Sequence, residues 1–128
     1  MRLLLDTHSF LWFIGGDKRL SDKAKAAIAD LDNEAFLSTA SLWEIAVKMN
    51  IGKLKLPRPF GELIPEQLMR NEIKVLRAEL SHMARYIALP LHHRDPFDRM
   101  IIAQAQEEAM TVVSKDDAFE RYDVDLLW

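Results

Sequence analysis

Short runs of apolar residues alternate along this chain with longer segments in which apolar residues recur every three or four positions. Runs of the first kind are typical of buried strands, and segments of the second kind are typical of helices with one face turned inward. The pattern predicts strands over 2–5, 35–38, 73–76, 111–114 and 124–126. It predicts helices over 8–14, 22–31, 42–50, 60–71, 81–89 and 96–109, and a short turn or helix over 116–121.

The predicted strands are almost wholly apolar, unlike the half-polar strands of a sheet that faces solvent. Because helical segments separate these strands, we expect them to run parallel, with helices covering both faces of the sheet. The sequence therefore predicts a three-layer α/β/α sandwich with a mainly parallel central sheet, formed by residues 1–128 as a single domain.

Polar residues mark several of the predicted helix starts. Ser81 stands where an N-cap is expected, and Ser41 with Glu44 has the spacing of a capping box. Asp95 followed by Pro96 is typical of an N-cap and a first helical residue.

Composition excludes some classes of protein. Apolar residues make up 49% of the chain and charged residues 29%, as in ordinary globular proteins, and the absence of cysteine excludes disulfides and cysteine-ligated zinc. No leader segment and no run of ~20 apolar residues is present, so we expect no membrane association and a cytoplasmic location. The net charge of −3 neither indicates nor excludes a polyanionic partner, since bound divalent cations would offset a local cluster of acids.

Four acids lie just beyond a predicted strand or in the first turn of a predicted helix, and they are Asp6, Glu44, Asp98 and Asp116. Asp6 directly follows the first apolar run. In an open parallel sheet, ligands bind in the crevice outside the carboxyl ends of the strands. Acids that follow strands share this edge, so we expect the four carboxylates to converge.

Such a convergence costs free energy. Two unit charges ~4 Å apart repel by about 4 kcal/mol at an effective dielectric constant of about 20. Either some of the acids take up protons or a divalent cation binds, and a site with only oxygen ligands selects hard ions such as Mg²⁺ or Mn²⁺. Such ions activate water and neutralise charge on a phosphodiester during in-line attack, which is the chemistry of many nucleases.

The same acids also have a purely structural explanation. Acids in a first helical turn stabilise the helix, and Glu44 is placed to pair with Lys48 one turn later. Asp98 follows an N-cap and a proline, and either Asp116 or Asp117 is placed to cap the last helix. From the residues alone, a non-catalytic module that binds RNA or protein, with its acids acting as helix caps, remains the alternative.

Five segments of the chain together resemble the PIN domain family, and within it the VapC-type toxins of toxin–antitoxin pairs. They are Leu3-Leu-Leu-Asp-Thr-His-Ser-Phe-Leu-Trp, Ser38-Thr-Ala-Ser-Leu-Trp-Glu-Ile-Ala-Val-Lys, Gly52-Lys-Leu, His93-Arg-Asp-Pro-Phe-Asp-Arg-Met and Ser114-Lys-Asp-Asp-Ala-Phe. The segments follow one another in the family's order and span almost the whole chain.

This resemblance implies a PIN-like sandwich and a divalent-metal-dependent endoribonuclease, the toxin of a toxin–antitoxin pair, which cleaves RNA with a metal-activated water. It also implies one or two Mg²⁺ or Mn²⁺ ions, a small cognate antitoxin and a homodimer. The family's acidic motif maps onto Asp6, Glu44, Asp98 and Asp116, and Asp117 remains an alternative for the fourth acid.

Further residues are candidates for contact with RNA. The Thr7 hydroxyl is placed to hold Asp6 or a metal-bound water, and Arg99 is placed to contact a phosphate or to pair with a site acid. Lys48 and Lys53 belong to the one basic cluster, which would position an RNA backbone beside the acids. Each also has an ordinary explanation as a loop hydroxyl or a solvated charge.

The histidines and tryptophans are expected to be less informative. His92 and His93 are not spaced as metal ligands on a helix, and we expect them in an exposed loop. Trp12 and Trp43 are expected in the core, or alternatively in a groove that takes an antitoxin helix or a second copy of the chain.

Overall fold

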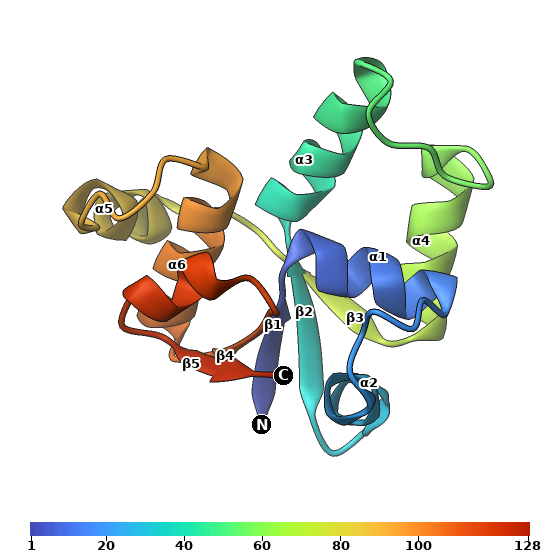
Figure 1. Cartoon of the computed structure of the whole chain (residues 1–128), viewed down its shortest axis with the longest axis horizontal. Helices are drawn as coiled ribbons and strands as arrows, with labels where there is room; N and C mark the ends of the chain where they lie inside the picture. Colours follow the sequence, from blue (N-terminus) through green and yellow to red (C-terminus); the bar gives the residue numbers. More distant parts are fainter.

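The computed structural model describes residues Met1–Trp128, and its centre is a sheet of five strands in the order β3-β2-β1-β4-β5 (Figure 1). Every neighbouring pair of strands is parallel, which confirms the predicted parallel sheet. The strands are β1 (Arg2–Leu5), β2 (Glu34–Ser38), β3 (Ile73–Leu76), β4 (Thr111–Val113) and β5 (Asp125–Leu127).

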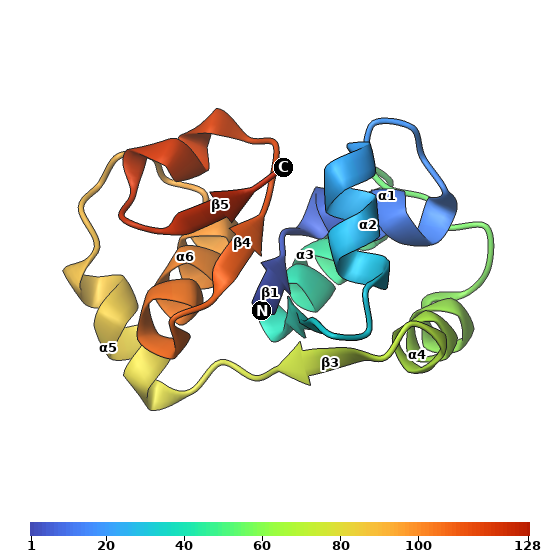
Figure 2. The same cartoon turned by 90° about the horizontal axis from the view of Figure 1, so that it is seen from below.

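Six α-helices and one 3₁₀-helix connect the strands and lie on both sides of the sheet, as the view from below shows (Figure 2). The expected three-layer α/β/α sandwich is therefore confirmed. No helix combines the length and the apolar character needed to cross a membrane. The helices are α1 (Thr7–Gly15), α2 (Asp22–Ala29), α3 (Thr39–Asn50), α4 (Phe60–Arg70), α5 (Leu80–Ala88), α6 (Pro96–Glu108) and η1 (Asp117–Arg121).

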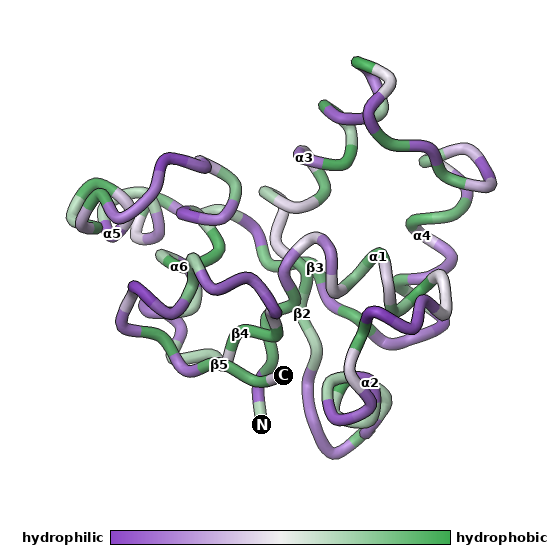
Figure 3. Tube along the Cα trace, viewed as in Figure 1, coloured by the Kyte–Doolittle hydropathy of each residue, from purple (hydrophilic) through white to green (hydrophobic).

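The first apolar run supplies both hydrophobic cores, because successive side chains of a strand point to opposite faces of the sheet. Leu3 and Leu5 pack on the face covered by α1, α2 and α4, whereas Leu4 packs on the face covered by α6 and η1. All three leucines are fully buried. In Figure 3 the strands near the C-terminus are hydrophobic, and the connection that enters α6 is hydrophilic.

The strand order creates a topological switch point between β1 and β4. From β1 the chain adds β2 and β3 on one side, and it later crosses to add β4 and β5 on the other. A crevice for ligands forms outside the carboxyl ends of the strands at such a point. Leu5 is in register with Val113. The residues that follow them, Asp6 and Ser114, therefore leave the sheet together at the edge of this crevice.

The predicted start of α3 is wrong. The helix begins at Thr39, directly after β2, and the hydroxyl of its N-cap Ser38 accepts the Ala40 N–H at 2.9 Å. Ser41 consequently lies inside the helix and forms no capping box with Glu44. Glu44 belongs to the second turn of α3, where a side chain does not cap the helix.

The predicted cap of α5 is also wrong. This helix begins at Leu80, and its N-cap is Glu79, whose backbone N–H donates to Nδ1 of His82 at 2.9 Å. Ser81 therefore lies within the first turn. The remaining predicted bounds differ from the observed ones by only a few residues, as expected because helix and strand ends depend on tertiary contacts.

Leu4→Ala should lower the free energy of unfolding by about 2–5 kcal/mol, because the truncation leaves a cavity at a fully buried position. Met69→Ala on α4 is the matched control: Met69 is 82% exposed, so the change should stay within about 0.5 kcal/mol. Urea denaturation followed by circular dichroism measures both. Equal losses in the two variants would contradict the assigned core.

Candidate active site

Asp6 stands at the end of β1 and is almost fully buried. Its Oδ1 accepts the Ser9 backbone N–H at 2.8 Å, which makes Asp6 the N-cap of α1, and its Oδ2 accepts the Ser114 hydroxyl at 2.6 Å. Burial raises the pKa of Asp6, and the hydrogen bonds from Ser114 and Ser9 act in the opposite direction. Each carboxylate oxygen has a second lone pair, so capping leaves Asp6 able to accept a further ligand.

Glu44 is buried in the second turn of α3, between a hydroxyl and an ammonium group. Its Oε1 accepts the Thr7 hydroxyl at 2.6 Å, and its Oε2 lies 2.6 Å from Nζ of Lys48. The pairing with Lys48 allowed by the sequence is thus present. Thr7, however, holds Glu44 and not Asp6, because α3 packs against α1.

Asp98 lies in the first turn of α6 but does not cap it. The N-cap is Asp95, whose Oδ1 accepts the backbone N–H groups of Phe97 and Asp98 at 2.9 and 3.1 Å. The Asp98 side chain is 17% exposed, and its Oδ2 lies 3.5 Å from Nε2 of His93. The Asp98 carboxylate is therefore free of a capping role and turned toward the edge of the sheet.

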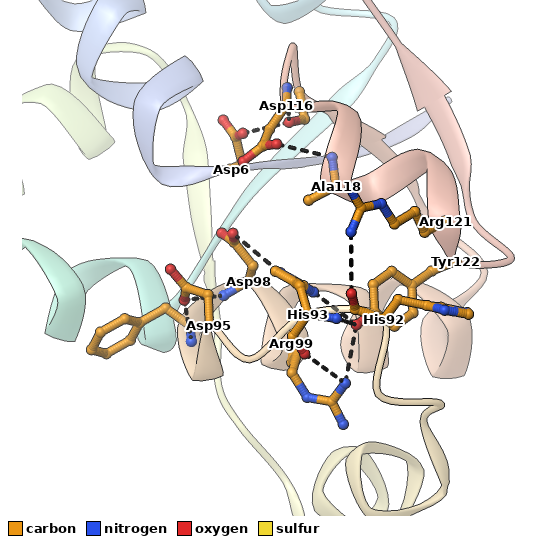
Figure 4. A network of polar contacts seen from close by, with 12 residues as sticks. Asp6, His92, His93, Asp95, Asp98, Arg99, Asp116, Ala118, Arg121 and Tyr122 are labelled. Carbon is orange, nitrogen blue, oxygen red and sulfur yellow. Dashed lines mark hydrogen bonds and ion pairs between the residues drawn. The ribbon is translucent and has the colours of Figure 1, made fainter.

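The pKa of Asp98 shows that the acids influence one another. Burial is the largest cause that raises this pKa, to about 8, and negative charges nearby add to the effect. These charges belong to Asp95, Glu44, Asp116 and Asp6. Figure 4 shows Asp6, Asp98 and Asp116 on the same side of the polar network. A site with this charge requires a retained proton or a cation.

Asp116 follows β4 and is the N-cap of η1. Its Oδ1 accepts the Ala118 N–H at 2.9 Å, and its own N–H donates to the Ser114 hydroxyl at 3.0 Å. Asp116, and not the neighbouring Asp117, lines a pocket of about 150 Å³ at the end of the sheet. The residues around this pocket are Asp6, His8, Trp12, Lys115 and Asp116.

The four acids suit a divalent cation in donor type and charge, since carboxylate oxygens are the ligands that hard ions prefer. No three acidic or histidine side chains are already close enough to hold one ion. The oxygens of Asp6 and Glu44 face protein donors, and Asp98 faces His93. Binding of one ion by three of these side chains therefore requires them to move closer together.

Arg99 was expected as an exposed phosphate contact or as the partner of a site acid, and it is neither. It is buried, and its Nη1 donates to the Pro90 carbonyl at 2.8 Å and to the Tyr122 hydroxyl at 3.0 Å. Successive helical residues are about 100° apart around the axis. Arg99 therefore points away from the acids although it directly follows Asp98.

Lys53 is exposed in the loop after α3, and its backbone N–H donates to the Lys48 carbonyl at 2.8 Å. The two lysines thus come from one end of α3. Their contact with RNA stays a prediction.

Sequence reasoning missed two partners of the acids, Ser114 and His93, and the tyrosine behind His93. Ser114 was assigned to a strand, although its place directly after the apolar residues of β4 was a usable signal. His93, expected in an exposed loop, is partly buried with its Nδ1 2.7 Å from the Tyr122 hydroxyl. Tyr122 carries no local signal, because its partners lie far away along the chain.

A family model described as the PIN domain matches residues 3–125. The chain belongs to the PIN domain family. The matched segment contains all the acids of the candidate site, and the resemblance inferred from five sequence segments is confirmed.

Two curated relatives of this PIN domain come from Mycobacterium tuberculosis. Ribonuclease VapC22 is 30% identical over 115 residues, which are 89% of this chain and 86% of that protein. Ribonuclease VapC16 is 33% identical over 63 residues, so that match spans only about half of each protein, 49% of this chain and 45% of the relative.

A solved structure of VapBC2 from Rickettsia felis, bound to a DNA fragment from its promoter, is similar over nearly the full length. The TM-score is 0.74 at 18% identity, and the match covers 99% of this PIN domain and 98% of that chain. At this identity the likeness shows a shared fold.

Without divalent cations, the difference in unfolding free energy between the wild type and Asp98→Asn should change with pH. The wild type should lose stability relative to the variant as the pH rises from about 4 to about 8. The raised pKa of Asp98 means that the native state keeps a proton which the unfolded chain releases near 3.8. This stabilisation is complete below that value and is lost as the pH rises through about 8, by at most about 1.4 kcal/mol per pH unit. Denaturant titrations in EDTA measure it. A difference between the variants that does not change with pH would contradict the raised pKa.

Proposed function

We propose that residues 1–128 form one PIN nuclease domain that cleaves RNA with the help of a divalent cation, as the toxin of a toxin–antitoxin pair. The observation that carries the proposal is the electrostatic convergence of Asp6, Glu44, Asp98 and Asp116 at the switch point of a parallel sheet. Membership of the PIN family and two relatives named ribonucleases support the class of reaction.

Two of the acids favour a catalytic site over a set of helix caps. Glu44 lies in the second turn of α3, and Asp98 follows the true cap Asp95, so neither carboxylate caps a helix. Burying them near other carboxylates opposes folding, and such conflicts concentrate at functional sites. The alternative, a non-catalytic binding module, accounts for the caps Asp6 and Asp116 alone.

The cofactor that fits these residues is Mg²⁺ or Mn²⁺, as one or two ions held by carboxylate oxygens. When bound, such an ion activates water and offsets the charge that develops on a phosphodiester. The chain's own hydroxyls orient the ligands: Thr7 donates to Glu44 at 2.6 Å, and Ser114 donates to Asp6 at 2.6 Å.

Lys48 has a second role in this proposal. Its ammonium balances the buried Glu44 at 2.6 Å while its side chain remains 37% exposed. With a cation held by the acids, Lys48 would be free to contact an RNA phosphate together with Lys53. Such contacts hold a backbone in place without selecting its sequence.

Asp6→Asn and Asp98→Asn should each lower divalent-cation-dependent RNA cleavage by about a hundredfold or more, because each removes a negative ligand from the site. Asparagine keeps the shape of the side chain, and at Asp6 it can still cap α1. Initial rates on a fluorescent single-stranded RNA, with Mg²⁺, with Mn²⁺ and with EDTA, measure the effect.

Asp117→Asn is the matched control, since Asp117 adjoins Asp116 but does not line the acidic pocket, and it should cleave like the wild type. Cleavage that persists in Asp6→Asn would identify a contaminating nuclease and end the proposal. Cleavage that persists in EDTA would contradict the proposed dependence on a divalent cation.

A homodimer is the assembly that we propose, formed through α5. This helix exposes Leu80, Met83 and Ile87 along one face. Met83 and Ile87 also line an apolar groove of about 650 Å³ between α3, α5 and α6, beside Trp43, which is 67% exposed and not in the core. A two-fold contact places the same surface of each copy against the other, so that an apolar ridge meets an apolar groove.

The antitoxin is the second partner, and a different groove suits it. Leu11 and Trp12 line this groove of about 380 Å³ together with Arg19 and Lys55. Arg19 is already paired with Asp17 at 2.7 Å, so Lys55 supplies the free positive charge of this groove. Its apolar lining and this charge fit a segment that carries both apolar and acidic residues. Because Trp12 also lines the acidic pocket, a segment bound there would reach the acids.

Ile87→Glu should convert the dimer to a monomer, because it places a charge in a contact that excludes water. Met69→Glu introduces the same charge at an equally exposed position on α4, 82% against 83%, and should remain dimeric. Light scattering after size exclusion measures both masses. Identical masses in the two variants would refute this contact.

A further inference from the structure

The connection between α5 and α6 places His93 between Asp98 and a buried tyrosine–arginine pair (Figure 4). Nδ1 of His93 lies 2.7 Å from the Tyr122 hydroxyl. Nε2 lies 3.5 Å from Oδ2 of Asp98 and has no hydrogen-bond partner, although it is buried. The imidazole is only 16% exposed, so protein contacts hold its orientation.

The hydrogen bonds of Tyr122 decide which nitrogen of His93 carries the proton. The phenol oxygen receives Nη1–H of Arg99 at 3.0 Å and the backbone N–H of His93 at 3.3 Å. These two donors fill the acceptor capacity of a hydroxyl oxygen. The phenol O–H must then donate, and Nδ1 of His93 is the acceptor that it faces. The proton of the neutral imidazole therefore resides on Nε2.

The hydrogen bond from Arg99 to Tyr122 cannot reverse, because a guanidinium group has donors and no acceptor. Arg99 is fixed by the Pro90 carbonyl at 2.8 Å and lies over the Tyr86 ring, 5.0 Å from its centre. The His93 ring also contacts the edge of Tyr122. Donation consequently runs from Arg99 through Tyr122 and His93 toward the acids.

We propose that His93 is a positioning residue of the acidic site: its Nε2–H donates to Oδ2 of Asp98 and leaves the other carboxylate oxygen free for a ligand. The present separation of 3.5 Å is longer than a hydrogen bond, and a small rotation of the Asp98 side chain closes it. Carboxylates that bind metals are themselves held by such outer hydrogen bonds. The benefit for cation binding rests on the proposed function, whereas the hydrogen bond does not.

The tautomer is tested first, by long-range ¹H–¹⁵N NMR of histidine-labelled protein in EDTA. His93 should be the Nε2–H form, with Nδ1 unprotonated. A neutral wild-type ring with its proton on Nδ1 would overturn the proposal, because no donor would then face Asp98.

Two substitutions then test the roles of the two ring nitrogens of His93 separately. His93→Gln places an amide N–H near the position of Nε2, and His93→Asn places one near Nδ1. By isothermal titration with Mn²⁺, His93→Gln should stay within about threefold of the wild type and His93→Asn should bind about 10–100-fold more weakly. His92→Asn is the matched control, because the His92 ring contacts the edge of Tyr122 without reaching Asp98, and its affinity should not change. Wild-type affinity in His93→Asn would overturn the proposal.

A measurement without metal tests the role of His93 independently of the proposed nuclease activity. In EDTA, the ¹³C shift of the Asp98 carboxyl group should change in His93→Asn and return in His93→Gln. A wild type that neither binds Mn²⁺ nor cleaves RNA would end the nuclease proposal, and the carboxyl shift would still decide the role of His93. A shift that is the same in all three proteins would end the His93 proposal alone.

Discussion

Carboxylates repel one another where the parallel strands end, and the surrounding structure is arranged to contain that repulsion. Asp6, Glu44 and Asp98 lose part of their hydration on burial, which strengthens their interaction. Each is contained differently: hydroxyl and backbone donors meet Asp6, the ammonium of Lys48 meets Glu44, and a raised pKa favours the neutral form of Asp98. Negative groups are thus concentrated at this edge of the sheet, and a bound divalent cation would reduce the repulsion between them.

Capping and ligand binding are compatible at this edge. Asp6 and Asp116 cap α1 and η1, and the positive ends of helices favour negative charge there. A cap uses one lone pair of a carboxylate that has several. The structural explanation of these acids is therefore correct and incomplete, whereas Glu44 and Asp98 have no cap to explain them.

Three residues at the start of α6 face different directions and have different roles. Asp95 caps the helix, Asp98 turns toward the other acids, and Arg99 turns toward the opposite side. Arg99 influences the site indirectly, since its hydrogen bond to Tyr122 orients the ring of His93 behind Asp98. A buried positive charge thus acts on the acids through a phenol and an imidazole without contacting them.

The sequence by itself determined the kind and order of the elements and the positions of the acids, because local spacing records burial and the ends of strands. Leu3-Leu4-Leu5 followed by Asp6 is enough to predict a buried strand that delivers a carboxylate. Only the tertiary structure decided which side chains donate hydrogen bonds to the acids. Ser114 and Asp6 are 108 positions apart in the sequence, and Thr7 and Glu44 are 37 positions apart. Such contacts follow from strand order and helix packing, which neighbouring residues do not encode. For the same reason the structure alone revealed that Arg99 is buried, that Trp43 is exposed and that His93 stands behind Asp98.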